Sequence, residues 1–311
     1  MILCIGPTPA AQRVMFFRRL TLDAVNRAAT TLDGVAGKSI NVAKVLHALG
    51  ERPLATGFVG GEHGDGIQAA LVERGIKCKF VRVSAPTRQC VTVIDESAGT
   101  QTELVEESRA VEPADYDKLA AIVRRQIARD CRAVVMSGTI PPGGPADLYL
   151  RFVGMANEAG ILSVADAQGP ALIEALKGGP ALVKPNRPEL EATVGRELRD
   201  EGAIIEAMRE LCERGAQRVV VTAGQHVALA FDGRNAWRII PPQIRAVNPI
   251  GSGDAFTAGL TRHLARGDDF GECCRWGAAA GAANALTPMA GEVNPEDVER
   301  LALHAQVRRI G

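Results

Sequence analysis

The amino-acid sequence predicts an α/β domain in which helices cover both faces of a mainly parallel β-sheet. Three observations support this prediction. Short, continuously apolar segments recur along the chain, as in strands that are buried on both faces. Helical patterns separate these segments, as in chains that form parallel sheets. Two further regions alternate apolar and polar residues, which indicates a small β appendage with one face in water.

The apolar segments begin at the start of the chain, where residues 1–5 form a strand-length run. Comparable runs follow at residues 133–136, 162–165, 181–183 and 218–222. A strand is also expected at residues 53–59. Because these runs are short and apolar throughout, they are typical of strands at the centre of a sheet.

Helical patterns lie between the apolar runs. Residues 39–49 carry Ile40, Ala43 and Leu46 at helical spacing, and Gly50 follows where such a helix would end. Residues 64–74 form a second helical pattern that stops at Gly75. Further helical patterns occupy residues 145–159 and 201–214. Strand and helix therefore alternate, as a parallel sheet requires.

The β appendage is expected from two separate parts of the chain. Residues 90–95 and 101–105 alternate apolar and polar side chains around the turn Glu96-Ser97-Ala98-Gly99, which indicates a hairpin. Residues 14–17 form another short strand candidate. We interpret these segments together as one small β unit inserted into the α/β body.

Composition excludes several classes of protein. The 311 residues include 36 Lys plus Arg and 36 Asp plus Glu, so no net field attracts nucleic acid or an anionic membrane. No apolar window reaches the length of about 20 residues that a membrane span needs. The seven cysteines are scattered without a Cys-x-x-Cys pattern, which favours reduced, buried thiols. We expect a cytoplasmic protein.

The most informative segment is Asn-Pro-Ile-Gly-Ser-Gly-Asp at residues 248–254. The small residues Gly251, Ser252 and Gly253 allow backbone N–H groups to converge on an anion, and the start of a helix adds its positive end. Asp254 follows in the first helical turn, where a carboxylate can accept a proton from a hydroxyl. These residues alone fit an ordinary loop and helix cap equally well.

The longer segment resembles the second signature of the ribokinase-like (PfkB) sugar kinases, and most closely the form found in tagatose-6-phosphate and fructose-1-phosphate kinases. Residues 36–43 resemble the first signature of that family. Similar segments follow in the expected order at residues 87–90 with 100–103, 137–143, 184–190 and 291–294. The resemblance implies a single ribokinase-like three-layer α/β/α domain over residues 1–311, with a β lid from about residues 10–36 and 84–109.

The resemblance also implies an ATP-dependent carbohydrate kinase that uses Mg²⁺. Asp254 would take the proton from the attacking sugar hydroxyl, and Gly251, Ser252 and Gly253 would hold the transferred group. The implied nucleotide-side residues are Lys184, Asn186, Glu189, Thr222, Gly224 and Asn284, of which Asn186 and Glu189 would place Mg²⁺ through water and Asn284 would lie near the adenine. The implied acceptor-side residues are Gln12, Gly37, Lys38, Asn41, Arg88, Ser137 and Asp254. The family often binds K⁺ near residues 247–248 and 291.

Lys38 and Arg88 match positions that hold the existing phosphate of the substrate in the phosphosugar branch. A pair of cations suits a dianion, and arginine can bind it with two hydrogen bonds. The alternative is that both are exposed charges on a mobile lid. The expected acceptor is therefore a ketohexose phosphate, such as tagatose 6-phosphate, fructose 1-phosphate or fructose 6-phosphate.

The chain departs from the family pattern on the acceptor side. Gln12 stands where the phosphosugar branch has an aspartate that binds sugar hydroxyls, so the charge is lost. Ala36 and Ser39 stand where the first signature has glycines. Because the nucleotide side is intact, phosphoryl transfer from ATP is better supported than any particular sugar.

Two other functions remain open. One is a sensor that binds a sugar phosphate or nucleotide with little turnover, although such a protein would not need the base Asp254. The other is a kinase for an unphosphorylated sugar or nucleoside, against which Lys38 and Arg88 argue. In either case the exposed face of a β lid invites pairing, so we expect a homodimer formed through the lid.

Overall fold

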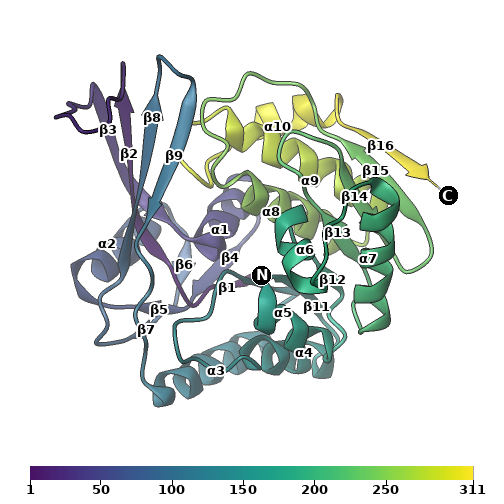
Figure 1. Cartoon of the computed structure of the whole chain (residues 1–311). Helices are drawn as coiled ribbons and strands as arrows, with labels where there is room; N and C mark the ends of the chain where they lie inside the picture. Colours follow the sequence, from purple (N-terminus) through teal and green to yellow (C-terminus); the bar gives the residue numbers. More distant parts are fainter. Residues whose placement is uncertain (311) are drawn as a thin grey trace.

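The structure, a computed structural model, describes residues 1–310 and consists of a large sheet between two layers of helices, with a smaller sheet rising from one side (Figure 1). The large sheet has ten strands in the order β16-β15-β14-β13-β12-β11-β10-β1-β4-β6. Its strands are β1 (Ile2–Ile5), β4 (Pro53–Thr56), β6 (Lys77–Cys78), β10 (Ala133–Ser137), β11 (Leu162–Asp166), β12 (Leu182–Val183), β13 (Val219–Val221), β14 (Ala228–Phe231), β15 (Ala236–Ile240) and β16 (Gln306–Ile310).

The helices divide between the two faces of this sheet. They are α1 (Lys38–Ala48), α2 (Gly61–Glu73), α3 (Pro113–Ile127), α4 (Leu148–Glu158), α5 (Gly169–Leu176), α6 (Arg187–Val194), α7 (Glu201–Glu213), α8 (Ser252–Leu264), α9 (Phe270–Ala285) and α10 (Pro295–Ala302). Helices α1, α2, α8, α9 and α10 contribute to one hydrophobic core, and α3 to α7 contribute to the other. None of the helices within residues 1–310 is long and apolar enough to cross a membrane.

The burial of the strands explains why helices cover both faces of the sheet. Every residue of β1 is buried, and its side chains alternate between the two cores: Ile2 and Cys4 face one, Leu3 and Ile5 the other. Pairing is parallel from β6 to β13, whereas β13 to β16 pair antiparallel. The predicted three-layer, mainly parallel α/β fold is confirmed, and the antiparallel edge of β14, β15 and β16 is an addition that the apolar runs did not reveal.

The expected strand at residues 53–59 is interrupted. It divides into β4 and β5 (Phe58–Val59), and β5 leaves the large sheet to pair with β7 (Val81–Arg82). The break falls at Gly57, where a Cβ atom would lie 1.9 Å from the carbonyl oxygen of Gly6. Only glycine allows the two segments to approach this closely, so the chain turns out of the sheet at this point.

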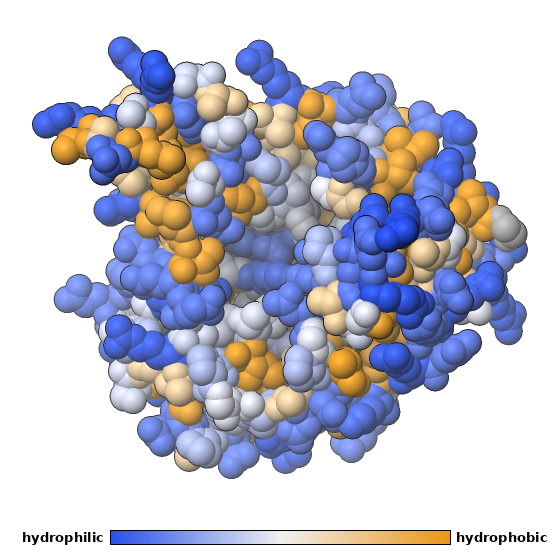
Figure 2. All heavy atoms as spheres, viewed as in Figure 1, coloured by the Kyte–Doolittle hydropathy of each residue, from blue (hydrophilic) through white to orange (hydrophobic). Residues whose placement is uncertain are grey.

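The smaller sheet, called the lid sheet below, has the order β3-β2-β8-β9. Its strands are β2 (Ala10–Phe17), β3 (Thr30–Ala36), β8 (Arg88–Asp95) and β9 (Thr100–Val105). The hairpin expected from alternation is β8 and β9, with Val93 opposite Thr102. The short strand candidate at residues 14–17 is the end of the longer β2, which pairs parallel with β8. Figure 2 shows a recess between the lid sheet, at the upper left, and the α/β body.

Candidate active site

Polar side chains gather where the parallel strands end. Ser137 is the last residue of β10, Asp166 is the last residue of β11, and Lys184 directly follows β12. Because neighbouring parallel strands end at the same edge of the sheet, these residues lie near one another beside the start of α8. Open α/β sheets bind ligands at this edge.

The turn before α8 has the geometry of an anion site. Gly251 caps the helix with φ 85°, and a Cβ atom on it would lie 2.8 Å from Ala290 Cβ and 2.9 Å from Gly291 N. The N–H of Ser252 donates to Pro249 O at 3.1 Å. Within residues 1–310, the N–H groups of Gly253 and Asp254 find no such acceptor. Two amides at the positive end of the helix are therefore available to an anion.

Asp254 lies beside these amides with a perturbed acidity. It is 7% exposed, and its Oδ2 accepts a hydrogen bond from Asn41 Nδ2 at 2.7 Å. Burial and the nearby Asp166 carboxylate raise the pKa of Asp254 to about 7, although Lys38, Lys184 and the Asn41 hydrogen bond act in the opposite direction. A carboxylate with a pKa near neutrality is suited to accept a proton from a hydroxyl.

Asp166 is the second buried carboxylate of the site, and sequence reasoning missed it. It has no exposed surface and contacts Lys38 Nζ at 2.9 Å, Lys184 Nζ at 3.1 Å and Thr257 Oγ1 at 3.0 Å. Burial opposes ionisation, but the two ammonium groups and their hydrogen bonds outweigh it and lower the pKa of Asp166 to about 2. The available signal was a charged residue directly after the apolar run at residues 162–165.

Lys38 lies between two carboxylates. Its Nζ atom is 3.3 Å from Glu189 Oε1 as well as 2.9 Å from Asp166. Burial alone would lower the pKa of Lys38, but the carboxylates of Asp166, Glu189 and Asp254 prevail and raise it. About a third of the side chain (35%) is exposed, so a ligand can reach this ammonium group.

Asn186 and Glu189 cap helix α6 reciprocally. Asn186 Oδ1 accepts from the Glu189 N–H, and Glu189 Oε2 accepts from the Asn186 N–H, both at 2.8 Å. No cluster of three His, Cys, Asp or Glu side chains suited to a metal occurs in residues 1–310. The remaining carboxylate lone pairs of Glu189 still fit Mg²⁺ that is bound through water and nucleotide phosphates, which is how this ion is usually held.

Three of the residues expected on the acceptor side have buried polar atoms without partners. Gln12 Oε1, Asn41 Oδ1 and Ser137 Oγ are buried and make no hydrogen bond within residues 1–310. Buried polar atoms are normally paired, so each of these three unpaired atoms is a candidate to bind a polar ligand. Gly37 is the N-cap of α1 with φ 106°, and a Cβ atom there would lie 2.8 Å from Pro9 Cα, so this turn requires glycine.

Arg88 and Lys38 do not share a partner in this structure. Arg88 Nη2 donates to Thr8 O at 3.1 Å and Nη1 to Glu106 O at 3.3 Å, while its buried Nε makes no hydrogen bond. Arg88 instead lines a hollow of about 30 Å³ together with Thr87, Ser108 and Arg109. Lys38 is paired with the carboxylates of Asp166 and Glu189.

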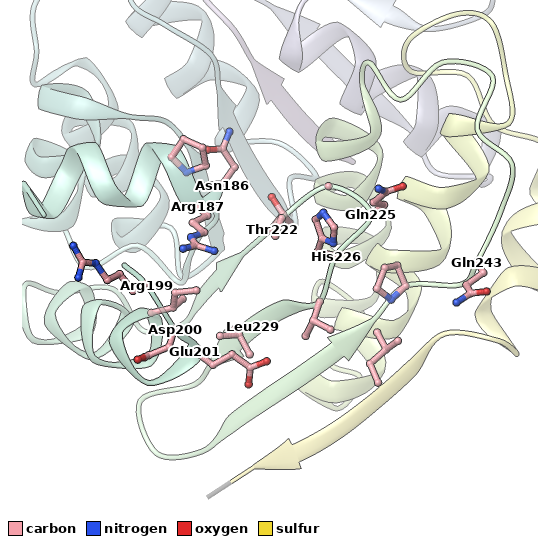
Figure 3. A pocket seen from close by; sticks show the side chains of 17 residues that line it. Asn186, Arg187, Arg199, Asp200, Glu201, Thr222, Gln225, His226, Leu229 and Gln243 are labelled. Atoms are coloured by element: carbon pink, nitrogen blue, oxygen red, sulfur yellow. The ribbon is translucent and has the colours of Figure 1, made fainter. Parts of the chain in front are cut away.

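Four of the residues expected on the nucleotide side fall into two groups. Asn186, Thr222 and Gly224 line a cavity of about 900 Å³ whose apolar wall includes Leu229 and Ile240 (Figure 3). Asn284 has no exposed surface, and its side-chain amide forms hydrogen bonds with the backbone. Its Nδ2 donates to Ile250 O at 2.9 Å, and its Oδ1 accepts from Gly291 N at 2.7 Å. In this arrangement Asn284 braces the turn before Asp254.

This fold, with a buried carboxylate beside free amides at a helix start, is that of a phosphotransferase of the carbohydrate kinase class. The family model of the pfkB carbohydrate kinases matches residues 1–297, and the chain belongs to this family. It is an ATP-dependent carbohydrate kinase.

Three solved structures illustrate the similarity. Phosphofructokinase-2 from Escherichia coli, solved in complex with fructose-6-phosphate, is 28% identical, with a TM-score of 0.88 over 97% of this chain and 98% of that chain. A possible 1-phosphofructokinase from Thermotoga maritima is 25% identical, with a TM-score of 0.91 over 100% of both chains. Ribokinase from Arabidopsis thaliana, at 20% identity and a TM-score of 0.76 over 97% of this chain and 98% of that chain, shares the fold.

Proposed function

We propose that this kinase transfers the γ-phosphoryl group of ATP to a hydroxyl of a ketohexose phosphate, with tagatose 6-phosphate, fructose 1-phosphate and fructose 6-phosphate as the candidate acceptors. The observation that carries the proposal is the position of Asp254, whose pKa is about 7, beside the free N–H groups at the start of α8. The phosphofructokinase relatives support a phosphorylated acceptor.

In the proposed reaction Asp254 removes the proton from the attacking hydroxyl. The acceptor oxygen forms a bond to the γ-phosphorus, the bond from that phosphorus to the β–γ bridging oxygen breaks, and ADP leaves with the electron pair. The proton on Asp254 then passes to solvent. The amides of Gly253 and Asp254 stabilise the charge that spreads over the transferred group. Mg²⁺, held by Glu189 and Asn186 through water, would neutralise nucleotide phosphate charge.

We assign Lys38 to the transferred phosphoryl group rather than to the phosphate already present on the acceptor. Its ammonium group lies between Asp166 and Glu189, and the Asp254 carboxylate contributes to raising its pKa. The existing phosphate of the acceptor would then be held by Arg88 and Arg109, which line the same hollow. The orphaned Nε of Arg88 supports this assignment, because a buried guanidinium N–H requires an acceptor.

The sugar hydroxyls would be bound by Gln12, Asn41 and Ser137. Each has a buried polar atom without a partner. Gln12 offers an amide oxygen and an NH₂ group where the phosphosugar branch has a carboxylate, so it can accept from one hydroxyl and donate to another. Gly37 would let the backbone approach the sugar closely.

ATP would occupy the cavity shown in Figure 3, with its phosphates toward Lys184, Thr222 and Gly224. The apolar wall at Leu229 and Ile240 suits a ribose or base. Asn284 would act on catalysis through the turn that it braces. A K⁺ ion near residues 247–248 and 291 is a further proposal; the Escherichia coli relative was solved in complex with potassium. We propose the cytoplasm as compartment, because ATP and sugar phosphates are cytoplasmic metabolites.

The test is ADP release with a panel of acceptors. It compares the three candidate sugar phosphates with unphosphorylated ketohexoses and nucleosides, and it includes Asp254→Asn. We expect turnover with at least one phosphorylated ketohexose and loss of turnover in the variant. Equal turnover with unphosphorylated sugars would favour a kinase for free sugars. Tight binding of nucleotide and sugar phosphate without any ADP release would favour a sensor.

A further inference from the structure

Lys44 is a buried lysine that the proposed reaction does not use. It lies on α1, three residues after Asn41, so both side chains leave the same face of the helix. Only 2% of its side chain is exposed. Burying an ammonium group is costly unless it is fully paired, so the position of Lys44 requires an explanation.

All three N–H bonds of the Lys44 ammonium group have partners. Nζ donates to Val35 O at 3.1 Å and to Ala290 O at 2.6 Å, and it lies 3.4 Å from Glu292 Oε1. Glu292 is held in turn by Arg74 Nη1, at 2.6 Å, at the end of α2. An ammonium group has three donors, so Lys44 has none left for a ligand.

The two carbonyl partners belong to separate parts of the molecule. Val35 lies near the end of β3, one of the two edge strands of the lid sheet, and is one residue from Gly34, which pairs with Gln12. Ala290 belongs to the loop 288–292, which follows α9. Lys44 therefore joins the base of the lid sheet to this loop.

The loop 288–292 packs directly behind residues 251–253, the turn before Asp254 that is called the catalytic turn below. A Cβ atom on Gly251 would lie 2.8 Å from Ala290 Cβ, and a Cβ atom on Gly291 would lie 2.6 Å from Asn41 Cα. Asn41 in turn donates the hydrogen bond to Asp254. With contacts this close, a displacement of the loop cannot leave Asn41 and Gly251 in place.

We propose that Lys44 is a positioning residue that couples closure of the lid sheet over the acceptor to the placement of Asn41 and the catalytic turn. The proposal rests on the proposed function, since it assumes that the lid closes over an acceptor. Its consequence is that the base is aligned only when the lid sheet is in place, which limits transfer of the phosphoryl group to water.

The variant that tests this proposal is Lys44→Met, which keeps the aliphatic stem and removes the ammonium group. We expect kcat to fall on the order of tenfold to a hundredfold, because small displacements of reacting groups have effects of this size. We also expect the ratio of ADP released to phosphorylated product formed to rise above one. The reason is that hydrolysis of ATP by water would no longer depend on closure of the lid sheet. Lys44→Arg keeps the charge and should restore part of the product ratio.

Val45→Ala is the matched control, because Val45 is the next residue of α1 and is fully buried. It should lower stability without changing the ratio of ADP to product. If Lys44→Met does not fold, Glu292→Gln replaces it and should shift the ratio in the same direction by less. The proposal would be overturned if the variant that is measured gives the same ratio of ADP to phosphorylated product as the parent.

Hydrogen exchange separates this proposal from the proposed function. In Lys44→Met, or in Glu292→Gln if that variant replaces it, residues 30–36 and 288–292 should both exchange faster, while α7 should exchange as in the parent. A parent that phosphorylates no acceptor would refute the proposed function, yet this exchange pattern would still show whether Lys44 links the two segments. Exchange that increases in neither segment, or equally throughout the chain, would refute the link itself.

Discussion

At the scale of single residues, two buried carboxylates in one cleft have opposite acidities. Asp166 forms ion pairs with Lys38 and Lys184, so its pKa falls to about 2 despite burial. Asp254 receives only the Asn41 hydrogen bond directly, so burial raises its pKa to about 7. Environments that separate the pKa values of two carboxylates in this way give the two groups different roles. Asp166 remains an anion that positions cations, and Asp254 can exchange a proton.

Replacing Asp254 by Asn should remove the base while keeping the shape of the side chain. We expect kcat to fall on the order of a hundredfold or more, because general base catalysis contributes about that much. Steady-state ADP release measures the change, and Asp297→Asn on α10 is the control. A variant as fast as the parent would exclude Asp254 as the base.

The rate should also depend on the ionisation of Asp254. Only the carboxylate form accepts a proton, so kcat/KM should be low in acid and rise through about pH 7. Asp166 remains ionised across this range because its pKa is about 2. Measuring kcat/KM between pH 5 and 9 would show this rise. A flat profile would contradict the assignment.

The same pKa predicts a pH-dependent effect on stability. A carboxyl whose folded pKa is raised binds its proton more tightly in the folded state, so Asp254 destabilises the fold as pH rises from about 4 toward and beyond 7. Asp254→Asn should therefore raise Tm at pH 8 and change it much less at pH 5. Thermal melts at the two pH values test this. An equal shift at both values would disprove the sign.

At the scale of elements, the catalytic turn can be tested by comparing two glycines at opposite ends of α8. Gly251 and Gly267 have φ of 85° and 84°, but a Cβ atom on Gly267 would meet nothing within 4 Å. Gly267→Ala should cost about 1–2 kcal/mol of unfolding free energy from backbone strain alone and leave kcat unchanged. Gly251→Ala should cost more and lower kcat, because Ala290 and Gly291 must move.

Denaturant unfolding and ADP release measure the two effects separately. If Gly251→Ala behaves like Gly267→Ala in both assays, the close packing behind the turn has no catalytic importance.

At the scale of the whole molecule, the lid sheet offers a surface for a second copy of the chain. Strand β9 is an edge strand, and Leu104 and Val105 on it are 55% and 47% exposed. An unprotected apolar edge favours pairing, so we predict a homodimer through the lid sheet. Leu104→Glu should shift the mass in sedimentation toward the monomer, whereas Leu303→Glu, at the end of α10, should not. A parent that is monomeric at every concentration would refute the dimer.

The sequence by itself determined the features that depend on neighbours along the chain. Apolar runs predicted the buried strands β1 and β10, and alternation predicted the hairpin of β8 and β9. The Gly251–Asp254 turn and the reciprocal caps of α6 are also local, because each hydrogen bond or backbone angle involves residues at most a few positions apart. Short-range patterns of this kind are readable without coordinates.

Only the tertiary structure decided which charges meet. Lys38 contacts Asp166 across 128 positions of sequence, and Asn41 contacts Asp254 across 213. No local pattern could show that Lys38 faces two carboxylates, or that Lys44 joins β3 to the loop 288–292. These contacts depend on where the parallel strands end and on how closely two segments can approach at a glycine. Electrostatic energy depends on the distance between charges in space, and not on their separation along the chain.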